Sequence, residues 1–578
     1  MTVTPSTIPS ATPPLQTPVP GEERRLSKGA YLSDLGNWLA GSAVIVALLF
    51  SIPVVTIIAF VLVPASPIWA HLVATVLPNY LINTLLMVLL VGGGVLLLGV
   101  PTAWLLTLYR FPGQRLFEWL LILPLAMPAY VIAYAYTDFL QFTGPPQTLL
   151  RELTGWSARE YWFPNIFTVG GAATMLTLVL YPYVYLLARS AFLEQSVCAL
   201  EVSRTLGCTP FQSFYRVALP LARPAIIGGM ILALMETLAD FGTVSYFGIQ
   251  TFTTGIYRAW FSMGDPVAAA QLSSALLGLV ALIILLERLN RGSKQYHHAT
   301  NRYQELPGYP LTGLRALGAI LLCALPVLLG FLLPAGILLS LAFEDGDAQF
   351  GRRYFTLIGN SFTLAALTAF FAVLLAVLVA YAVRLKPSLL VRLATRVASL
   401  GYAVPGSIIA IGVLLPFAWF DNQLDRWMTA QFGLSTGLLL TGTVAALIFA
   451  YLVRFLAVAL QSIESGLGKI RPSMDEAARS LGRGPFATLR TIHGPLMRGS
   501  LLTAALMVFV DVMKELPATL LIRPFNFDTL AVQAHNLAAD ERLSEAATPA
   551  LAIVVVGLFP VILLSRAIAR SRAGSQSS

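Results

Sequence analysis

Four carboxylates and one lysine interrupt two long apolar stretches of the sequence. Glu236 and Asp240 lie in the first stretch, and Asp511 and Glu515 lie in the second, beside Lys514. A charge buried in a bilayer costs on the order of 2.5 to 3.5 kcal/mol even on insertion scales, so these side chains are expected to face a pathway or a partner. The i, i+4 spacing predicts that each acidic pair shares one helix face, where like charges repel unless a cation or a proton intervenes.

Other polar groups in these apolar surroundings carry weaker signals. Tyr130, Tyr134 and Tyr136 could offer phenolate oxygens, but aromatic residues commonly pack between helices, and we expect packing here. Arg454 is expected near the end of an apolar stretch, where its long side chain can reach the interface. The three cysteines show neither close pairing nor metal-ligand spacing with histidine, so the sequence predicts no disulfide framework or zinc site, and any metal ligands stay unidentified.

The elements that position these residues are membrane-spanning helices. Of the 578 residues, 57% are hydrophobic and 11% charged, whereas a soluble protein normally carries about twice that charge. The apolar residues form blocks, such as 41–63 and 81–108, that reach the roughly 20 residues needed to cross a bilayer. A transmembrane β-barrel would instead alternate apolar and polar residues in shorter segments. The sequence therefore predicts an all-α polytopic membrane protein.

About twelve spans can be placed along the chain. They are centred near residues 53, 94, 127, 178, 236, 278, 328, 372, 406, 446, 511 and 557. Most of the 37 basic residues fall in alternate connections, which by the positive-inside rule places those connections and both termini in the cytoplasm. The net charge of +9 is then a sign of topology and not of nucleic-acid binding. The expected parts are a disordered tail, a first repeat, a cytoplasmic linker, a second repeat and a short tail, at 1–40, 41–290, 291–312, 313–570 and 571–578.

A segment that follows the fourth span recurs after the tenth, 275 residues later. The first copy runs from Glu201 to Pro220 and the second from Glu476 to Pro495, with Glu, Arg, Leu, Gly, Pro and Phe in register. Further upstream, two more pairs recur at an offset of about 277, namely Asn83 with Asn360 and Pro128 with Pro405. Because each repeat holds an even number of spans, six, the two halves enter the membrane in the same orientation.

Local chemistry predicts that each repeated segment forms two short helices at an angle. Ser473 and Glu476 have the spacing of a capping box, which could start the first helix of the second copy, and Gly482 is a natural stop for it. Thr209 with Pro210, or Gly484 with Pro485, then offers an N-cap and a first-turn proline for the next helix.

The repeated segments resemble the EAA loop of permease subunits in binding-protein-dependent ABC importers, whose pattern is E-A-A, three residues, G, nine residues, I-x-L-P. The first copy departs from it with Val202 and Ser203 in place of two alanines, and the second has Gly494 where leucine is usual. The resemblance implies the MetI-like type I importer fold, with these loops docking on ATPase subunits. The residues that it assigns to coupling are Glu201, Gly207, Pro210, Leu219, Pro220, Glu476, Ala477, Ala478, Gly482, Pro485, Ile492 and Pro495.

The same resemblance implies the partners and the role of the chain. We find no G-x-x-x-x-G-K-[ST] phosphate-binding loop, so ATP would be used by two copies of a separate ATPase subunit, and this chain would be neither an enzyme nor a holder of cofactors. A periplasmic binding protein would deliver substrate to this multi-pass protein of the inner membrane, where lipid surrounds it. The candidate residues of the translocation path are Glu236, Asp240, Asp511, Lys514 and Glu515.

A twelve-span permease fused in one chain looks most like the ferric-iron branch of this family. The segment from Lys514 to Thr519, followed by Arg523 to Ala531, favours iron, and carboxylate oxygens would suit a hard cation such as Fe³⁺. Two alternatives stay open: a permease for thiamine or another small solute, and a secondary transporter of six plus six spans driven by an ion gradient. It also stays open that Lys514 simply neutralises Asp511 and that the other acids bond to neighbouring helices.

Overall fold

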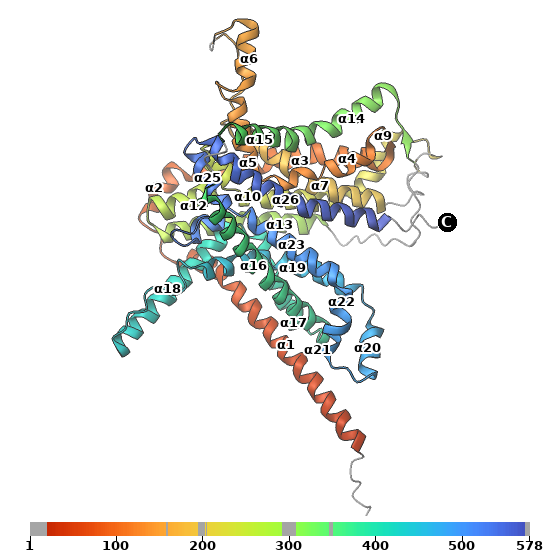
Figure 1. Cartoon of the computed structure of the whole chain (residues 1–578), viewed down its shortest axis with the longest axis vertical. Coiled ribbons are helices and arrows are strands. Elements are labelled where there is room, and N and C mark those ends of the chain that lie inside the picture. Colours follow the sequence, from red (N-terminus) through yellow and green to blue (C-terminus); the bar gives the residue numbers. More distant parts are fainter. Residues whose placement is uncertain are drawn as a thin grey trace, which may run out of the picture.

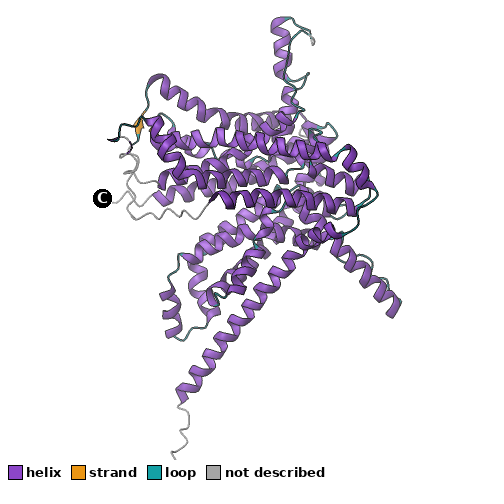
Figure 2. Cartoon of the chain, turned by 180° about the vertical axis from the view of Figure 1, so that it is seen from behind, coloured by secondary structure: helices purple, strands orange, loops and turns teal. Residues whose placement is uncertain are grey.

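The computed structural model of the chain describes residues 20–157, 160–194, 203, 205–291, 308–345 and 351–572. Figure 2 shows that nearly all of this part is helical. The described strands are β1 (Tyr109–Arg110) and β2 (Tyr309–Pro310), which pair in parallel and join the end of one span to the approach of another.

The helices of the N-terminal half lead from the first span to the linker. They are α1 (Pro20–Ala59), η1 (Phe60–Leu62), α2 (Ile68–Thr75), α3 (Leu77–Leu108), α4 (Gln114–Leu120), η2 (Leu123–Ala126), α5 (Ala129–Leu140), α6 (Pro145–Thr154), α7 (Val169–Glu194), α9 (Pro210–Ser213), η3 (Phe214–Ala218), α10 (Leu219–Ala239), α11 (Gly242–Tyr246), α12 (Phe252–Tyr257), η4 (Arg258–Ser262) and α13 (Pro266–Arg291).

The C-terminal half repeats this order of elements. Its helices are α14 (Gly313–Val327), η5 (Leu328–Leu332), α15 (Leu333–Asp345), α16 (Arg352–Leu385), α17 (Leu389–Ala398), η7 (Leu400–Ala403), α18 (Gly406–Phe432), α19 (Val444–Gly468), α20 (Pro472–Ser480), α21 (Pro485–Thr488), η8 (Leu489–His493), α22 (Gly494–Leu496), α23 (Arg498–Met513), α24 (Pro517–Ile522), α25 (Leu530–Ala539) and α26 (Leu543–Arg572).

Within the described residues, ten helices are long and apolar enough to cross a membrane, and two bent helix pairs raise the number to as many as twelve. The pairs bend by 92° between residues 114–126 and 129–154, and by 78° between 485–496 and 498–513. The expected all-α polytopic fold is confirmed. The expected centres at 406 and 446 are wrong, however, because Pro405 and the side chain of Thr443 begin α18 and α19 at those points.

The start of the first helix differs from the expected tail. Helix α1 begins at Pro20, so the structure has helical backbone over residues 20–40 of the expected tail. A run of Glu, Arg and Leu after Pro20 contains good helix formers, and a proline is favourable in the first turn. Residues 1–19 lie outside the part that the structure describes.

The two halves use their repeated residues in the same way. The amide of Asn83 donates to the backbone oxygen of Gln250 at 2.8 Å, and that of Asn360 donates to the oxygen of Asp528 at 3.0 Å. Each bond ties a long span to the connection that precedes α12 or α25. Likewise, prolines 128 and 405 both precede a helix, α5 and α18, in extended backbone.

The first helix of each half packs against the other half. Helix α1 contacts α16, α17 and α18, whereas α14 contacts α3 and α4, and η5 contacts α7. The backbones come close: a Cβ atom on Gly412 would lie 2.4 Å from the oxygen of Pro53, and one on Gly330 would lie 2.7 Å from the oxygen of Leu178. In Figure 1, α16, α19 and α1 run diagonally away from the group that contains α3 and α7. The repeats are thus intertwined by their first helices and splayed at one side.

Candidate functional site

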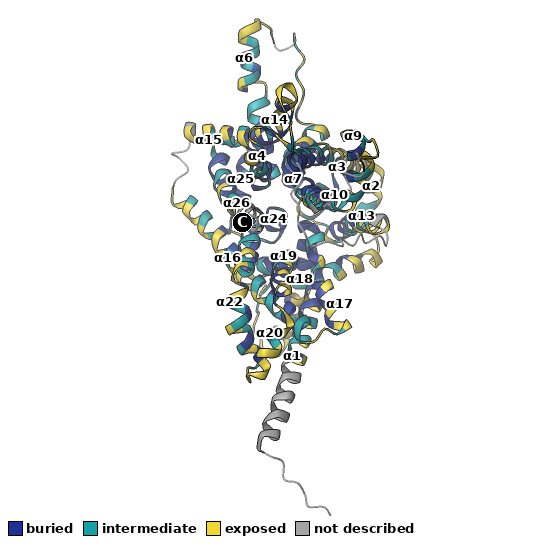
Figure 3. Ribbon diagram, turned by 90° about the vertical axis from the view of Figure 1, so that its right-hand side faces the viewer, coloured by how far each residue is buried: buried dark blue, intermediate teal, exposed yellow. Residues whose placement is uncertain are grey.

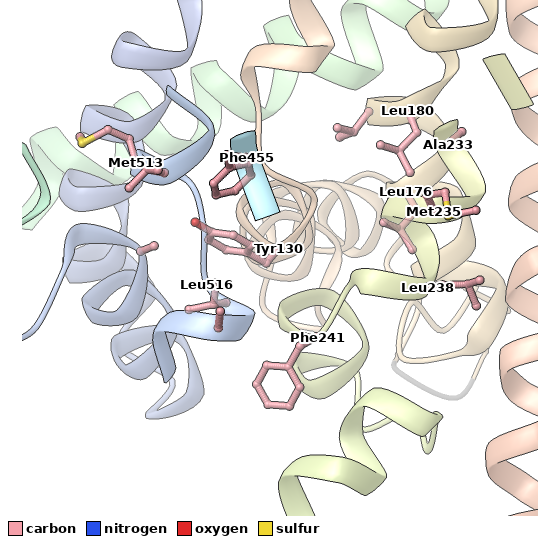
Figure 4. Packing of buried hydrophobic residues seen from close by; sticks show 14 of the residues in the cluster. Tyr130, Leu176, Leu180, Ala233, Met235, Leu238, Phe241, Phe455, Met513 and Leu516 are labelled. Carbon is pink, nitrogen blue, oxygen red and sulfur yellow. The ribbon is translucent and has the colours of Figure 1, made fainter. Parts of the chain in front are cut away.

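A cavity of about 120 Å³ lies between the two halves, and we call it the central cavity. All five residues that the sequence placed on a pathway line it: Glu236, Asp240, Asp511, Lys514 and Glu515. Apolar side chains of both halves complete the wall. In the close-up of Figure 4, Leu176 and Leu180 lie on one side and Leu516 on the other. The structure therefore brings together two acidic pairs that are 275 residues apart in sequence.

The acidic pairs do not share a helix face, so this expectation is wrong. Helix α10 ends at Ala239, and Asp240 adopts extended backbone as the C-cap. Its carboxylate accepts hydrogen bonds from the hydroxyl of Thr243 at 3.0 Å and from the amide of Val244 at 3.1 Å. Asp240 thus satisfies the free amides at the start of α11, since the first four N–H groups of a helix lack partners. The span is broken at the depth of the cavity.

The second half breaks in the same place. Helix α23 ends at Met513, and Glu515 accepts from the amides of Ala518 at 2.9 Å and Thr519 at 3.0 Å at the start of α24. A short helix thus begins next to the cavity in each half. The sequence showed the acidic residues but not the helix breaks beside them. The residue directly after Asp240 or Glu515 is not a proline, and the surrounding sequence is mostly apolar, as in an unbroken span.

Arg454 is the functional candidate that the sequence reasoning missed. The residue lines the central cavity, and its Nη1 contacts Glu515 Oε1 at 3.0 Å with only 8% of the residue exposed. The expectation that it reaches an interface is wrong because α19 extends to Gly468, which puts position 454 near the helix centre. Its Nε has no hydrogen-bond partner within the described residues. The sequence signal that could have found it is a difference between the two repeats, because the position equivalent to Arg454 in the first repeat is Val179.

The charges of the central cavity are unevenly paired. Lys514 Nζ contacts Asp511 Oδ1 at 2.9 Å, as the open alternative held, and Arg454 is paired with Glu515. Asp240 is used as a helix cap. In the described part of the chain, Glu236 is then the cavity carboxylate with neither a hydrogen bond nor an ion pair. Four carboxylates face two cations, so the cavity has an excess of negative charge.

The tyrosine cluster divides between the cavity and the packing around it. Tyr130 lines the cavity, where Figure 4 shows it close to Phe455 and Leu516. Tyr134 shares a hydrogen bond of 2.8 Å with His535, and Tyr136 donates to the backbone oxygen of a residue in η5 at 2.7 Å. The expectation of packing is confirmed for these last two. Over the ranges described, no group of three His, Cys, Asp or Glu residues could hold a metal ion.

The second repeated loop, residues 476–495, forms the expected helix, turn and helix. Helix α20 ends before Gly482, whose φ of 77° is the left-handed region that favours glycine, and Gly484 is the N-cap of α21 with Pro485 in the first turn. The capping box is wrong: α20 begins at Pro472, so Ser473 lies inside the helix and makes no cap. The helix begins at the proline because proline suits the first helical position.

The first repeated loop, residues 201–220, has the same turn where the structure describes it. Glu201 and the side chain of Pro210 lie outside the described residues. Gly207 has a φ of 85°, and the amide of Cys208 donates to the oxygen of Ser203 at 3.0 Å. The equivalent bond in the second loop, from Arg483 to Ala478, measures 2.9 Å. Both loops then pass through a π-helical turn, η3 or η8, before the span.

The two loops present matching apolar side chains to solvent. Leu206 and Leu481 are 77% and 79% exposed, and Phe211 and Phe486 are similarly exposed at the next repeated position. Sequence reasoning assigned no role to these four, although their identity in both copies was visible. Figures 1 and 3 show α9 and α20 on the same side of the molecule. Each loop therefore carries an apolar pair on a compact helical turn.

The residues assigned to coupling by resemblance have mixed positions on these turns. The exposed ones are Gly207, Pro220, Glu476, Ala477, Gly482 and Pro495; Leu219 and Ile492 are half-buried, and Ala478 and Pro485 are buried. The buried alanine and proline hold the turn together and cannot touch a partner, whereas Glu476 and Ala477 can.

The loops are held to their spans by different chemistry. In the second loop, Asp475 accepts from Arg384 Nε at 2.9 Å and lies 2.7 Å from His493 Nε2. In the first loop, the ring of Phe214 packs against Trp104, with ring centroids 4.8 Å apart, and Trp104 packs against Phe192. Each loop is thus in direct contact with a long span, the second with α16 and the first with α3.

Comparison with known proteins gives consistent matches. Residues 95–293 and 372–573 match the family model described as "Binding-protein-dependent transport system inner membrane component". The chain is 28% identical over 496 residues to the Fe(3+)-transport system permease protein FbpB 2 of Haemophilus influenzae. The aligned region covers 84% of this chain and 89% of that protein. It is 25% identical to the ferric transport system permease protein FbpB of Actinobacillus pleuropneumoniae, over 69% of this chain and 58% of that protein. A molybdenum transport system permease protein, ModB of Escherichia coli, is 29% identical over 33% of this chain and 86% of its own length.

Proposed function

Since this chain belongs to the family of inner-membrane components of binding-protein-dependent transport systems, we propose that it forms the path by which ferric iron enters the cell. Two copies of a separate ATPase subunit would drive the transport, and a periplasmic protein would deliver the iron. The repeated loops and both termini would lie in the cytoplasm, because the basic residues gather in the connections on that side.

The central cavity is the observation that carries the proposal. It lies between the two halves, and the candidate path residues surround it. Burying charges at such a place costs free energy. Their presence is therefore better explained by a passing solute than by a purely structural role. The broken spans on either side place two short helices, α11 and α24, next to the cavity.

The repeated loops support an external ATPase. Each offers an exposed leucine and phenylalanine on a rigid turn, and matched apolar patches of this kind mark protein interaction sites. Two equivalent patches on one side suit two copies of one partner. A closing motion of the partner would be passed through η3 and η8 to α10 and α23, which carry Glu236 and Asp511.

Ferric iron is the cargo that the relatives and the charge favour together. The relatives whose printed names refer to ferric transport cover 69% and 84% of this chain, whereas the molybdenum permease covers 33% of it. An excess of carboxylates suits a hard cation and opposes an oxyanion. Glu236, which has no partner in the described residues, is the side chain that we expect to meet the iron first.

Uptake of radioactive ferric iron tests the cargo. The chain is reconstituted with its ATPase and its binding protein in vesicles, and uptake is measured with and without ATP. We expect ATP-dependent iron uptake that is reduced at least severalfold in Glu236→Gln, while ATPase activity is retained. Glu464→Gln, on α19 but away from the cavity, is the matched control. Iron uptake that needs no ATP, or ATP-driven uptake of molybdate and not iron, would overturn the proposal.

The docking of the ATPase is tested separately. Leu206→Arg together with Leu481→Arg should abolish stimulation of the ATPase while the chain still inserts and elutes as one species. Lys469→Leu changes a charge on the same side but outside the apolar pairs and should have little effect. Normal stimulation in the double variant would refute the assignment of the repeated loops.

A further inference from the structure

Two hairpins project from the halves at equivalent positions. The first hairpin, residues 141–157 and 160–168, contains α6, and the second hairpin, residues 419–443, contains the last turns of α18. In each, the helix ends at a glycine in left-handed backbone, Gly155 with φ 71° and Gly433 with φ 66°, and an extended segment returns along the helix. The two glycines are 278 residues apart, close to the offset of the other repeats.

The first hairpin turns polar groups towards its own return segment. Arg151 Nη1 donates to the oxygen of Phe142 at 2.8 Å and to the hydroxyl of Tyr161 at 3.0 Å. The Tyr161 hydroxyl donates in turn to Gln147 at 2.8 Å. These groups satisfy one another inside the hairpin.

The second hairpin does the same with two aspartates. Asp425 Oδ1 accepts from the hydroxyl of Ser435 at 2.8 Å and from the amides of Thr436 at 2.7 Å and Gly437 at 3.0 Å. Asp421, which is 0% exposed, accepts from the amides at the start of the next span, one of them at 2.8 Å. Both carboxylates therefore accept their hydrogen bonds from groups within the hairpin.

The outer faces of the hairpins are apolar. Large side chains that are at least two-fifths exposed include Leu149, Leu153, Trp156 and Trp162 on the first hairpin, and Trp419, Phe420, Trp427, Phe432, Leu434 and Leu438 on the second. On the last turns of α18, residues 420, 424 and 427 share one face by their i, i+4, i+7 spacing, whereas Asn422, Arg426 and Thr429 share the opposite one. A hairpin surrounded by water would expose mainly polar side chains, whereas each of these hairpins exposes apolar side chains along one face.

Chain order places both hairpins at the membrane face opposite the repeated loops. The first hairpin precedes α7 and the second precedes α19, and these spans lead across the membrane to the repeated loops at their other ends. Figure 1 shows α6 and the end of α18 pointing away from each other, α6 at the top and α18 at the lower left. A single protein partner above the central cavity would lie between them and not on both outer faces.

We propose that both hairpins lie in the headgroup layer of that membrane face, with their aromatic and leucine side chains against lipid. Tryptophan and other aromatic residues favour this layer because their rings bury an apolar body and keep a polar edge in reach of water. An amphipathic helix with modest charge lies in the interface plane in the same way. Each half thereby has a lateral contact with lipid at its outer edge. This contact is separate from the proposed iron path and from the proposed contact with the ATPase.

Spin labels test the proposal in the full chain. With Cys198, Cys208 and Cys323 replaced by serine or alanine, single cysteines are introduced at Leu153 and Leu434, and the labelled protein is placed in phosphatidylcholine and phosphatidylglycerol nanodiscs. Oxygen partitions into lipid and a charged nickel chelate stays in water, so power saturation with each reagent distinguishes the two surroundings. Leu89 on α3 is the lipid control and Leu481 on the second repeated loop the water control.

We expect the oxygen-to-nickel accessibility ratio at both hairpin positions to be severalfold above that at Leu481 and below that at Leu89, which lies deeper in the bilayer near the middle of its span. A ratio equal to that at Leu481 would overturn the proposal. So would a low accessibility to both reagents in the chain alone, which would indicate protein packing. If either cysteine variant fails to fold, as judged by its elution profile, Leu149→Cys and Leu438→Cys report on the same two faces.

Discussion

The buried ion pair between Arg454 and Glu515 predicts a large and specific loss of stability. The Glu515 side chain is only 2% exposed, so Arg454→Met leaves a carboxylate in the protein interior without its cation. Breaking a buried pair in this way costs about 3 to 5 kcal/mol. We expect about 3 kcal/mol, the low end of that range, because Glu515 keeps its bonds from Ala518 and Thr519.

The double variant separates this cause from a simple packing defect. Arg454→Met with Glu515→Gln removes both charges, so its free energy of unfolding should recover most of the loss, giving a coupling energy of about 1 to 3 kcal/mol. Lys514→Met is the matched control: its partner Asp511 has a side chain that is 21% exposed, and the loss should stay below about 1 kcal/mol. Unfolding is followed in mixed micelles by tryptophan fluorescence as SDS is added. Equal losses in Arg454→Met and the double variant would refute the reasoning.

Three more predictions follow from other sites. Gly412→Ala should destabilise the chain by about 1 to 3 kcal/mol, because its Cβ would meet the backbone oxygen of Pro53, whereas Gly359→Ala, with open space around it, should be neutral or stabilising; SDS unfolding measures both. His535, on α25 outside the spans, is held neutral because burial lowers its pKa to about 4, so stability that is complete above pH 6.5 should be lost as pH falls towards 4. His535→Gln should flatten that pH profile, and an unchanged profile would contradict the assignment. Arg384→Gln should uncouple the second repeated loop from α16 by removing its ion pair with Asp475, which is checked by a lower ratio of uptake to ATP hydrolysis with the fold intact.

The sequence predicted the features that repeat, because repetition is visible without coordinates. The pairs Gly207 with Gly482 and Asn83 with Asn360 have equivalent structural roles, as their offsets implied. The acidic residues were found because a carboxylate in an apolar run is expensive wherever it lies. The role of Arg454 was missed because a span boundary that is wrong by several residues moves a central charge to an apparent end.

Features that depend on contacts between distant segments left no local signal. The break after Ala239 is stabilised by Asp240 only once α11 turns back, and an i, i+4 pattern alone looks like a continuous helix. The packing of α1 against α18 rests on Gly412, one of 44 glycines, and nothing near it in sequence refers to Pro53. The inward polar groups of the two hairpins are likewise revealed only by the return segments that meet them.

The packing of each first helix against the opposite half has a consequence for biosynthesis. Helix α1 leaves the ribosome before α18, but the backbone that fits its Pro53 is Gly412, which is made more than half a chain later. Until then α1 waits in the bilayer with lipid in place of its final neighbours. Assembly therefore cannot finish half by half, and α1 completes its contacts only after the helices of the second half have been inserted.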